Sequence, residues 1–294
     1  CNRLLQMTGN SLYADYMETA IYNALMASLK ADASQIAKYS PLEGWRHEGE
    51  EQCGMHINCC NANGPRAFAM IPQFAYQVQD DCVRVNFYAP SEAELVLPGK
   101  KPVRLKQTTD YPRTDQIEIE VDPAKETAFT IALRIPAWSK IAVVSVNGQP
   151  QDGVLQGAYL PVNRKWKKGD RITVKLDLRA RLVERNQAQA IVRGPVVLAR
   201  DSRFGDGFVD EASVVVSKDG YVELTPVKTP GFAWLAFTAP MVLGTDLESN
   251  RAPKQIHFCD FASAGNTWDK TQRYRVWLPK TLNVMHSPYR PYNQ

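Results

Sequence analysis

The pattern of apolar and polar positions changes once along the chain, from a helical period to a strand period. Between residues 11 and 28, apolar or small side chains recur three and four positions apart, which predicts one buried helix face. We expect a short helix that ends at Gly9-Asn10, with Ser11 as the N-cap of the next one. A further helix is expected from about Asn63 to Tyr76, with Pro65 in its first turn.

From residue 82 onward the period is two, which is typical of half-buried strands. Apolar side chains alternate with polar ones at Val83/Val85/Phe87, Ile117/Ile119/Val121, Phe129/Ile131/Leu133 and Ile172/Val174/Leu176. Turn signals separate these runs, so the pattern predicts a β-sandwich. A second set of strands is expected after the VRGP of 192–195, including 232–238 and 273–279. The predicted domains are therefore 1–77, 78–185 and 186–294.

A helical segment of this length followed by a loop cannot bury both of its faces alone. The first 77 residues are therefore expected to be the last helices of a larger helical domain. The alternative is a small helical cap that packs on the sandwich.

Composition excludes some classes of protein. The 294 residues are 44% hydrophobic and 22% charged, which is ordinary for a globular protein. The net charge is +4, and no run of five or more basic residues occurs, so nucleic-acid binding is not indicated. No apolar run reaches the length of a membrane span. The sequence does not indicate the compartment, and the periplasm or cytoplasm of a bacterium would suit it.

The segment EQCGMHINCCNANGPRAFAM holds the candidate chemistry. The adjacent Cys59 and Cys60 come just before the expected helix, where backbone N–H groups and the helix dipole favour a thiolate. Cys1, Cys53 and His56 are further donors of the kind that zinc prefers. From the residues alone, a zinc site and a pair of buried, unreactive cysteines remain alternatives.

Three stretches together carry a resemblance: NSLYADYMETAIYNALMAS, YSPLEG and HINCCNANGPR. They resemble glycoside hydrolase family 127, whose best-known activity is non-reducing-end β-L-arabinofuranosidase. The resemblance implies an α+β multidomain fold, in which an (α/α)6 barrel is followed by two β-sandwich domains. It also implies that the chain lacks most of the barrel.

The resemblance implies roles for particular residues. Cys1, Cys59 and Cys60 would bind Zn²⁺, and Cys59 would also be the nucleophile. Tyr39, in the YSPLEG loop, matches a tyrosine close to the reactive cysteine and the sugar. The resemblance assigns no role to His56; by its residue type it could orient a ligand or touch the substrate, although a structural histidine is the commoner case.

The sequence departs from the family pattern at three points. The family's zinc-binding glutamate would stand two residues before Cys1, and its acid/base glutamate and sugar-binding histidines further upstream, so none of them is in the printed sequence. Ile57 stands where some members carry another cysteine. We therefore expect this chain to be inactive without the N-terminal part of the same protein.

The resulting expectation is a retaining glycosidase with a zinc-bound thiolate nucleophile, acting on an oligo- or polysaccharide of the plant cell-wall type. One alternative is a non-catalytic carbohydrate-binding or structural β-sandwich protein with a structural zinc site. Another is a secreted protein with disulfides among Cys1, Cys53, Cys59 and Cys60. Trp45 could stack on a sugar ring, but a single loop tryptophan more often packs. Neither the exact sugar nor the oligomeric state follows from the sequence.

Overall fold

The computed structural model describes residues 1–48, 59–211, 213–243 and 252–279. Within these residues the chain divides into two compact units that are not contiguous in sequence. Unit 1 comprises Cys1–Thr19 and Ala67–Leu178, and unit 2 comprises Ala20–Arg66 and Arg179–Gln294. The three sequence domains proposed above stay a prediction. No helix of the described part is long and apolar enough to cross a membrane.

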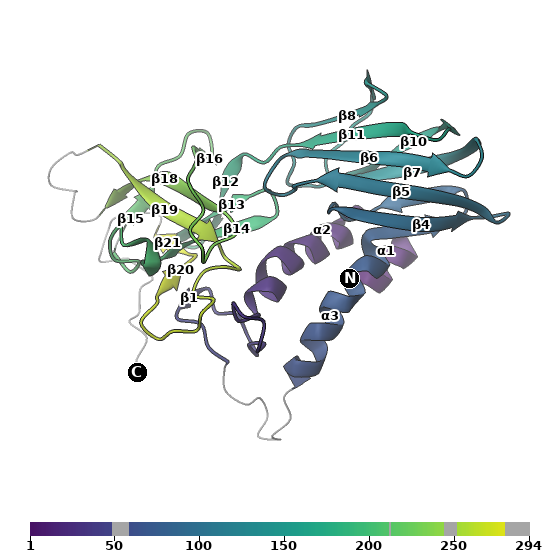
Figure 1. The fold of residues 1–294 in the computed structure, drawn as a ribbon. Helices are drawn as coiled ribbons and strands as arrows, with labels where there is room; N and C mark the ends of the chain where they lie inside the picture. Colours follow the sequence, from purple (N-terminus) through teal and green to yellow (C-terminus); the bar gives the residue numbers. More distant parts are fainter. Residues whose placement is uncertain (49–58, 212, 244–251, 280–294) are drawn as a thin grey trace. The chain divides into compact units, whose positions relative to one another are not determined.

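The α-helices of the described part lie in the first 75 residues, as the helical period predicts, and a 3-10 turn follows at Ser202–Phe204 (Figure 1). The helices of the first 75 residues are α1 (Asn2–Thr8), α2 (Ser11–Ala20), a π-helical turn (Ile21–Leu25) and α3 (Cys59–Ala75). Gly9 ends α1 in the left-handed conformation, with φ 64°. The expectation that Ser11 caps α2 is wrong. Asn10 Oδ1 accepts from the Leu12 N–H at 3.0 Å, whereas the Ser11 hydroxyl donates to the Gly157 carbonyl.

Helix α3 begins earlier than expected. The sequence placed its start near Asn63, but Cys59 and Cys60 form its first two positions. Gly64 and Pro65 are weak helix formers, yet they lie inside the helix. A β-carbon on Gly64 would lie 2.5 Å from Ile36 Cδ1, so the 29–48 segment packs directly against this turn. Tertiary packing therefore overrides the local signal.

Unit 1 is built on two sheets (Figure 1). The four-stranded sheet has the order β10-β7-β3-β2, with bounds Ala158–Trp166, Thr127–Ile135, Cys82–Val85 and Tyr76–Gln79. The six-stranded sheet has the order β4-β5-β6-β11-β8-β9, with bounds Ser91–Leu97, Lys101–Thr109, Gln116–Pro123, Asp170–Leu176, Ala142–Val146 and Gln149–Pro150. All pairs are antiparallel except β3 with β7.

The core of unit 1 comes from the inward positions of both sheets. Ile117, Ile119 and Val121 on β6, and Ile131 and Leu133 on β7, are fully buried. Tyr76 on β2 bonds to Ser91 on β4, at 2.9 Å, and to Gln107 on β5, at 2.8 Å, so the two sheets lie against each other. The alternation read from the sequence therefore predicted the sandwich-like packing correctly.

In unit 2 the described strands form one connected 11-stranded sheet. Its main path is β15-β18-β19-β14-β13-β12-β16, with bounds Ser213–Val215, Ala236–Leu243, Lys254–Asp260, Val196–Asp201, Ala188–Arg193, Ala180–Arg185 and Tyr221–Val222. Four short strands join this path: β1 (Glu43–Gly44), β17 (Thr225–Pro226), β20 (Tyr274–Arg275) and β21 (Leu278–Pro279).

The strand expected over 232–238 begins only at Ala236. Asp260 is the reason, because its carboxylate accepts from the backbone N–H groups of Trp234 and Leu235 at 3.1 and 2.8 Å. Those two donors are therefore used in a turn. The strand expected over 273–279 is likewise reduced to β20 and β21.

Candidate active site

The two thiols of Cys59 and Cys60 have different surroundings, although they are adjacent. Cys59 is exposed, and Cys60 is half-buried. The Cys60 thiol donates to the Lys38 carbonyl, with Sγ and O 3.7 Å apart. Burial is the largest cause that raises the pKa of the Cys60 thiol, and the neighbouring Cys59 thiol adds to it. One thiol is therefore open to a ligand, and the other is held against the preceding loop.

The first turn of α3 offers an anionic group a favourable place. Backbone N–H groups in that turn lack intrahelical acceptors, and the helix dipole is positive at this end. Cys59 and Cys60 stand in that turn rather than before it. The dipole effect falls off within the first turn, so both residues lie where it acts, but burial opposes ionisation of the Cys60 thiol.

The loop that receives Cys60 is closed on itself. The Lys38 N–H donates to the Glu48 carbonyl at 2.8 Å, which brings the two ends of this 11-residue loop together. Tyr39, the next residue, is 46% exposed, and its ring meets His47 edge-on with centroids 5.8 Å apart. Because Tyr39 follows Lys38 directly, the predicted sugar-contacting tyrosine is placed beside the cysteine pair.

Arg46 anchors this loop to the body of unit 2. Its side chain is fully buried and donates to the carbonyls of Ala27, Ala262 and Phe261 at 2.6, 3.1 and 2.9 Å. Burial lowers the pKa of its guanidinium. The guanidinium also lies 5.0 Å from the ring centres of Phe261 and Tyr274. A buried cation needs acceptors, and three carbonyls and two aromatic rings surround the terminal nitrogens of Arg46 although its Nε has no partner, so Arg46 anchors the loop.

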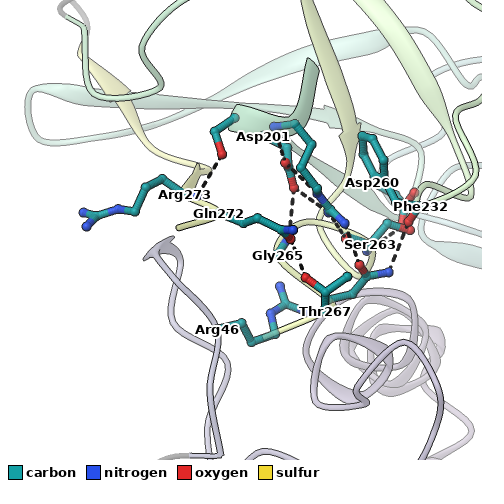
Figure 2. Close-up of polar contacts among 12 residues, drawn as sticks. Arg46, Asp201, Phe232, Asp260, Ser263, Gly265, Thr267, Gln272 and Arg273 are labelled. Atoms are coloured by element: carbon teal, nitrogen blue, oxygen red, sulfur yellow. Dashed lines mark hydrogen bonds and ion pairs between the residues drawn. The ribbon is translucent and has the colours of Figure 1, made fainter. Parts of the chain in front are cut away.

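The turn that Arg46 contacts is itself held by a polar network. Figure 2 shows Asp201 joined to the Gly265 N–H. The Asn266 amide donates to the Phe232 carbonyl at 3.1 Å. Asp201 also pairs with Arg203 at 2.6 Å. The Tyr274 hydroxyl donates to the Pro41 carbonyl at 2.6 Å, which ties this region to the loop a second time.

The proposed zinc ligands fall in both units. Cys59 and Cys60 belong to unit 2, and Cys1 is the exposed N-cap of α1 in unit 1. Over the part of the chain that is described, no cluster of three or more His, Cys, Asp or Glu side chains is assembled for a metal. Two adjacent thiols, one exposed and one oriented, are suitable as two of the ligands. His56 and Cys53 lie outside the described residues.

The described cysteines are all free thiols, including Cys1, Cys59 and Cys60. No disulfide among these three is therefore formed in the structure. Cys259 is fully buried in β19, as expected for an unreactive core residue, and Cys82 is half-buried in β3.

The acidic residues of the YADYME segment are structural. Arg134 on β7 is fully buried and donates to Asp15 and, at 2.6 Å, to Glu18, which is itself 0% exposed. Tyr111 also donates to Glu18, at 2.8 Å. Burial alone would lower the pKa of Arg134, but the two negatively charged carboxylates outweigh that effect and raise it. These carboxylates attach α2 to the sandwich and are not available for catalysis.

Two other residues of the quoted motifs also hold elements together. Asn23 donates to the Pro195 carbonyl and accepts from the Val197 N–H, both at 2.8 Å. Glu43 lies opposite Arg275 in the pairing of β1 with β20, and the Arg275 Nε reaches it at 3.5 Å. These contacts attach the π-helical turn to the start of β14 and the short strand β1 to β20.

Sequence reasoning missed Arg46 and the Lys38 carbonyl. Arginine is rarely fully buried, so nothing in the composition marks Arg46 as an anchor. Every residue has a backbone carbonyl, so the residue type does not indicate that the Lys38 carbonyl accepts a hydrogen bond from Cys60. The one available signal was the position of Arg46 between two aromatic rings, Trp45 and His47, in an extended segment.

Comparison with known proteins agrees with this arrangement. The family model for the β-L-arabinofuranosidase GH127 catalytic domain matches residues 1–73, and the model for the GH127 middle domain matches residues 82–178. A curated relative, the non-reducing end β-L-arabinofuranosidase of Bifidobacterium longum subsp. longum, is 26% identical over 222 residues. That alignment covers 66% of this chain and 32% of the relative.

Solved structures show the same fold. A GH127 β-L-arabinofuranosidase from Geobacillus stearothermophilus T6 superposes with a TM-score of 0.78 at 22% identity, over 94% of this chain and 47% of its own. A glycoside hydrolase gives 0.80 at 24% identity (94% and 50%), and a GH127 β-arabinofuranosidase gives 0.79 at 24% (96% and 48%). The chain thus spans about half the length of these proteins. With the two family models covering more than half of its residues, the chain belongs to glycoside hydrolase family 127.

Proposed function

We propose that this chain provides the nucleophile of a retaining glycosidase that cleaves arabinofuranosides. The single observation that carries the proposal is the contrast within the cysteine pair. Cys59 is exposed at the first position of α3, and Cys60 is oriented by the Lys38 carbonyl. In this proposal Cys59 reacts with the sugar, and the bond from Cys60 to the Lys38 carbonyl fixes the start of α3 on which Cys59 stands.

The chemistry proceeds in two steps. Cys59 Sγ attacks the anomeric carbon, the bond from that carbon to the leaving oxygen breaks, and a general acid protonates that oxygen. Water then attacks the same carbon, the carbon–sulfur bond breaks, and the acid's conjugate base takes the proton from the water. Two displacements at one carbon retain its configuration.

Cys1, Cys59 and Cys60 are the residues that we propose for zinc. A bound zinc ion would supply one thing, the deprotonated state of its thiol ligands near neutral pH. The chain's own contribution is the helix terminus that favours the negative charge and the loop that orients Cys60. Tyr39 is proposed to contact the sugar because it is exposed next to that contact. The role proposed for His56 rests on its residue type and on its position three residues before Cys59 in the sequence.

The test is a substitution at each cysteine in the enzyme that carries this chain. We expect Cys59→Ser to reduce hydrolysis of an arabinofuranoside panel by at least about a thousandfold. Cys82→Ser is the matched control, because that thiol is half-buried in β3 of unit 1, and it should keep near-normal rates. Unchanged hydrolysis by Cys59→Ser would show that the nucleophile is another group. Metal analysis of the same variants should show less bound zinc after loss of Cys60.

A non-catalytic role with a purely structural zinc remains the second candidate. The exposure of Cys59 does not favour it, because an exposed thiol is accessible to a substrate. Retained zinc and folding with no hydrolysis of any arabinofuranoside by the complete enzyme would support that role.

A further inference from the structure

The extended segment after β1 presents two aromatic side chains on one side. Side chains of an extended chain alternate between faces. Arg46 points inward and is fully buried, so Trp45 and His47 point the other way, and both are only partly buried. Their ring centres lie 4.2 Å apart with 36° between the planes. Trp45 is therefore not an isolated packing residue but half of a ring pair.

Two further side chains extend this pair. Tyr39 meets His47 edge-on at 5.8 Å, and 46% of Tyr39 is exposed. The exposed Lys270 places its Nζ 5.8 Å from the centre of the Trp45 ring. The group formed by Tyr39, Trp45, His47 and Lys270, here called the aromatic group, combines flat apolar faces with an ammonium, an imidazole and a phenol.

The aromatic group is held rigidly although its side chains are partly exposed. Arg46, between Trp45 and His47, makes three bonds to backbone carbonyls. The pairing of Glu43–Gly44 with Tyr274–Arg275 fixes the same segment from its other end. Side chains that are fixed before a ligand arrives lose little conformational freedom on binding. A packing role alone would not need exposed rings on so firmly anchored a segment.

We propose that the aromatic group is a sugar-binding subsite beside the cysteine pair, one that accepts an uncharged sugar ring of an arabinose-containing glycan. The apolar C–H face of a sugar packs against aromatic rings, and its hydroxyls take hydrogen bonds from a few polar groups. The location follows from the loop, since Cys60 bonds to the carbonyl of Lys38, the residue before Tyr39. The proposal rests on the function proposed above and adds Trp45, His47 and Lys270 to it.

Binding to this chain tests the subsite without requiring hydrolysis. The probe is methyl β-L-arabinofuranoside, and its transfer of saturation from the protein is followed by NMR over a concentration series. The wild-type chain should bind it with an affinity in the millimolar range, as is usual for one sugar on a few side chains. Trp45→Ala should weaken that binding about tenfold or more, and Trp45→Phe, which keeps a ring, should weaken it less.

Phe208→Ala is the matched control, because Phe208 is an aromatic residue of unit 2 that is 83% exposed and lies outside the aromatic group. Its binding should equal that of the wild-type chain. No binding by the wild-type chain, or equal binding by Trp45→Ala with an unchanged circular dichroism spectrum, would overturn the subsite. Binding of the probe forms no bond to sulfur and tests the subsite, whereas hydrolysis by Cys59→Ser in the complete enzyme tests the nucleophile, so a failed subsite and a failed nucleophile give different results.

Discussion

Replacing Arg134 by methionine should destabilise unit 1 strongly. The variant leaves Asp15 and Glu18 without their cation, and Glu18 is 0% exposed. Removing one partner of a buried ion pair costs about 3–5 kcal/mol, because the remaining charge is left desolvated and unpaired. A domain is typically stable by about 5–15 kcal/mol. The variant should therefore lose a fifth or more of the free energy of unfolding.

The assay is urea denaturation followed by near-ultraviolet circular dichroism, compared with a surface variant. Arg104→Met is the matched control, because Arg104 pairs with Glu92 at 3.4 Å while both side chains are well exposed. Exposed pairs contribute about 0–1 kcal/mol. Adding Glu18→Gln to Arg134→Met should recover part of the loss, since one of the buried charges is then removed. Equal unfolding free energies for the two arginine variants would refute the view that Asp15 and Glu18 stabilise unit 1 through their buried ion pairs with Arg134.

Three further predictions concern local physics. Gly265→Ala should lower the free energy of unfolding by at least about 3 kcal/mol, because its φ is 61° and a β-carbon would lie 2.6 Å from Tyr274 Cδ1. Gly220→Ala is the control: its φ is 79° but the space around it is open, so it should lose only about 1 kcal/mol. Thermal unfolding of both variants measures the difference. Burial raises the pKa of the Cys259 thiol, so iodoacetamide at pH 8.5 should modify it only after denaturation; native labelling seen by mass spectrometry would contradict its burial. Burial also raises the pKa of Tyr159 to about 12, above the unfolded value of about 10, so its contribution of about 2 kcal/mol is complete below pH 10 and lost toward pH 12. Tyr159→Phe should flatten the alkaline fall in stability, and an identical fall in both proteins would contradict this assignment.

The parts of the fold that the sequence predicted well are those with an unambiguous period. The alternation in β6, β7 and β11 is tied to one buried face, and each of these strands appears at its expected place. Helix α2 follows its paired apolar series for the same reason. The patterns succeed because burial of one face decides the conformation.

The predictions that failed share a different cause: a contact with a residue distant in sequence determines the local structure. Pro65 indicated a helix start, yet packing of Ile36 on Gly64 supports an earlier turn. Asp260 takes two backbone donors that a strand over 232–235 would need. Arg46 resembles a surface residue by type, but three backbone carbonyls and two aromatic rings from residues distant in sequence surround it. One sequence read alone contains no record of such contacts.

The candidate site was predictable only as far as residue identity allows. The cysteine pair and Tyr39 are found from motif resemblance, and the structure adds which thiol is exposed and which is held. The Trp45–His47 pair needed the burial of Arg46 before its direction was known. The residue types follow from the sequence, but the exposure and direction of their side chains follow only from the structure.

Trapping the covalent intermediate tests the central claim most directly. The enzyme carrying this chain is mixed with an aryl arabinofuranoside, quenched in acid within milliseconds, digested and examined by peptide mass spectrometry. The account predicts an arabinosyl group on the thiol of Cys59, absent from Cys60 and lost in Cys59→Ser. A sugar attached to another residue, or turnover of the substrate by Cys59→Ser at the normal rate, would contradict it.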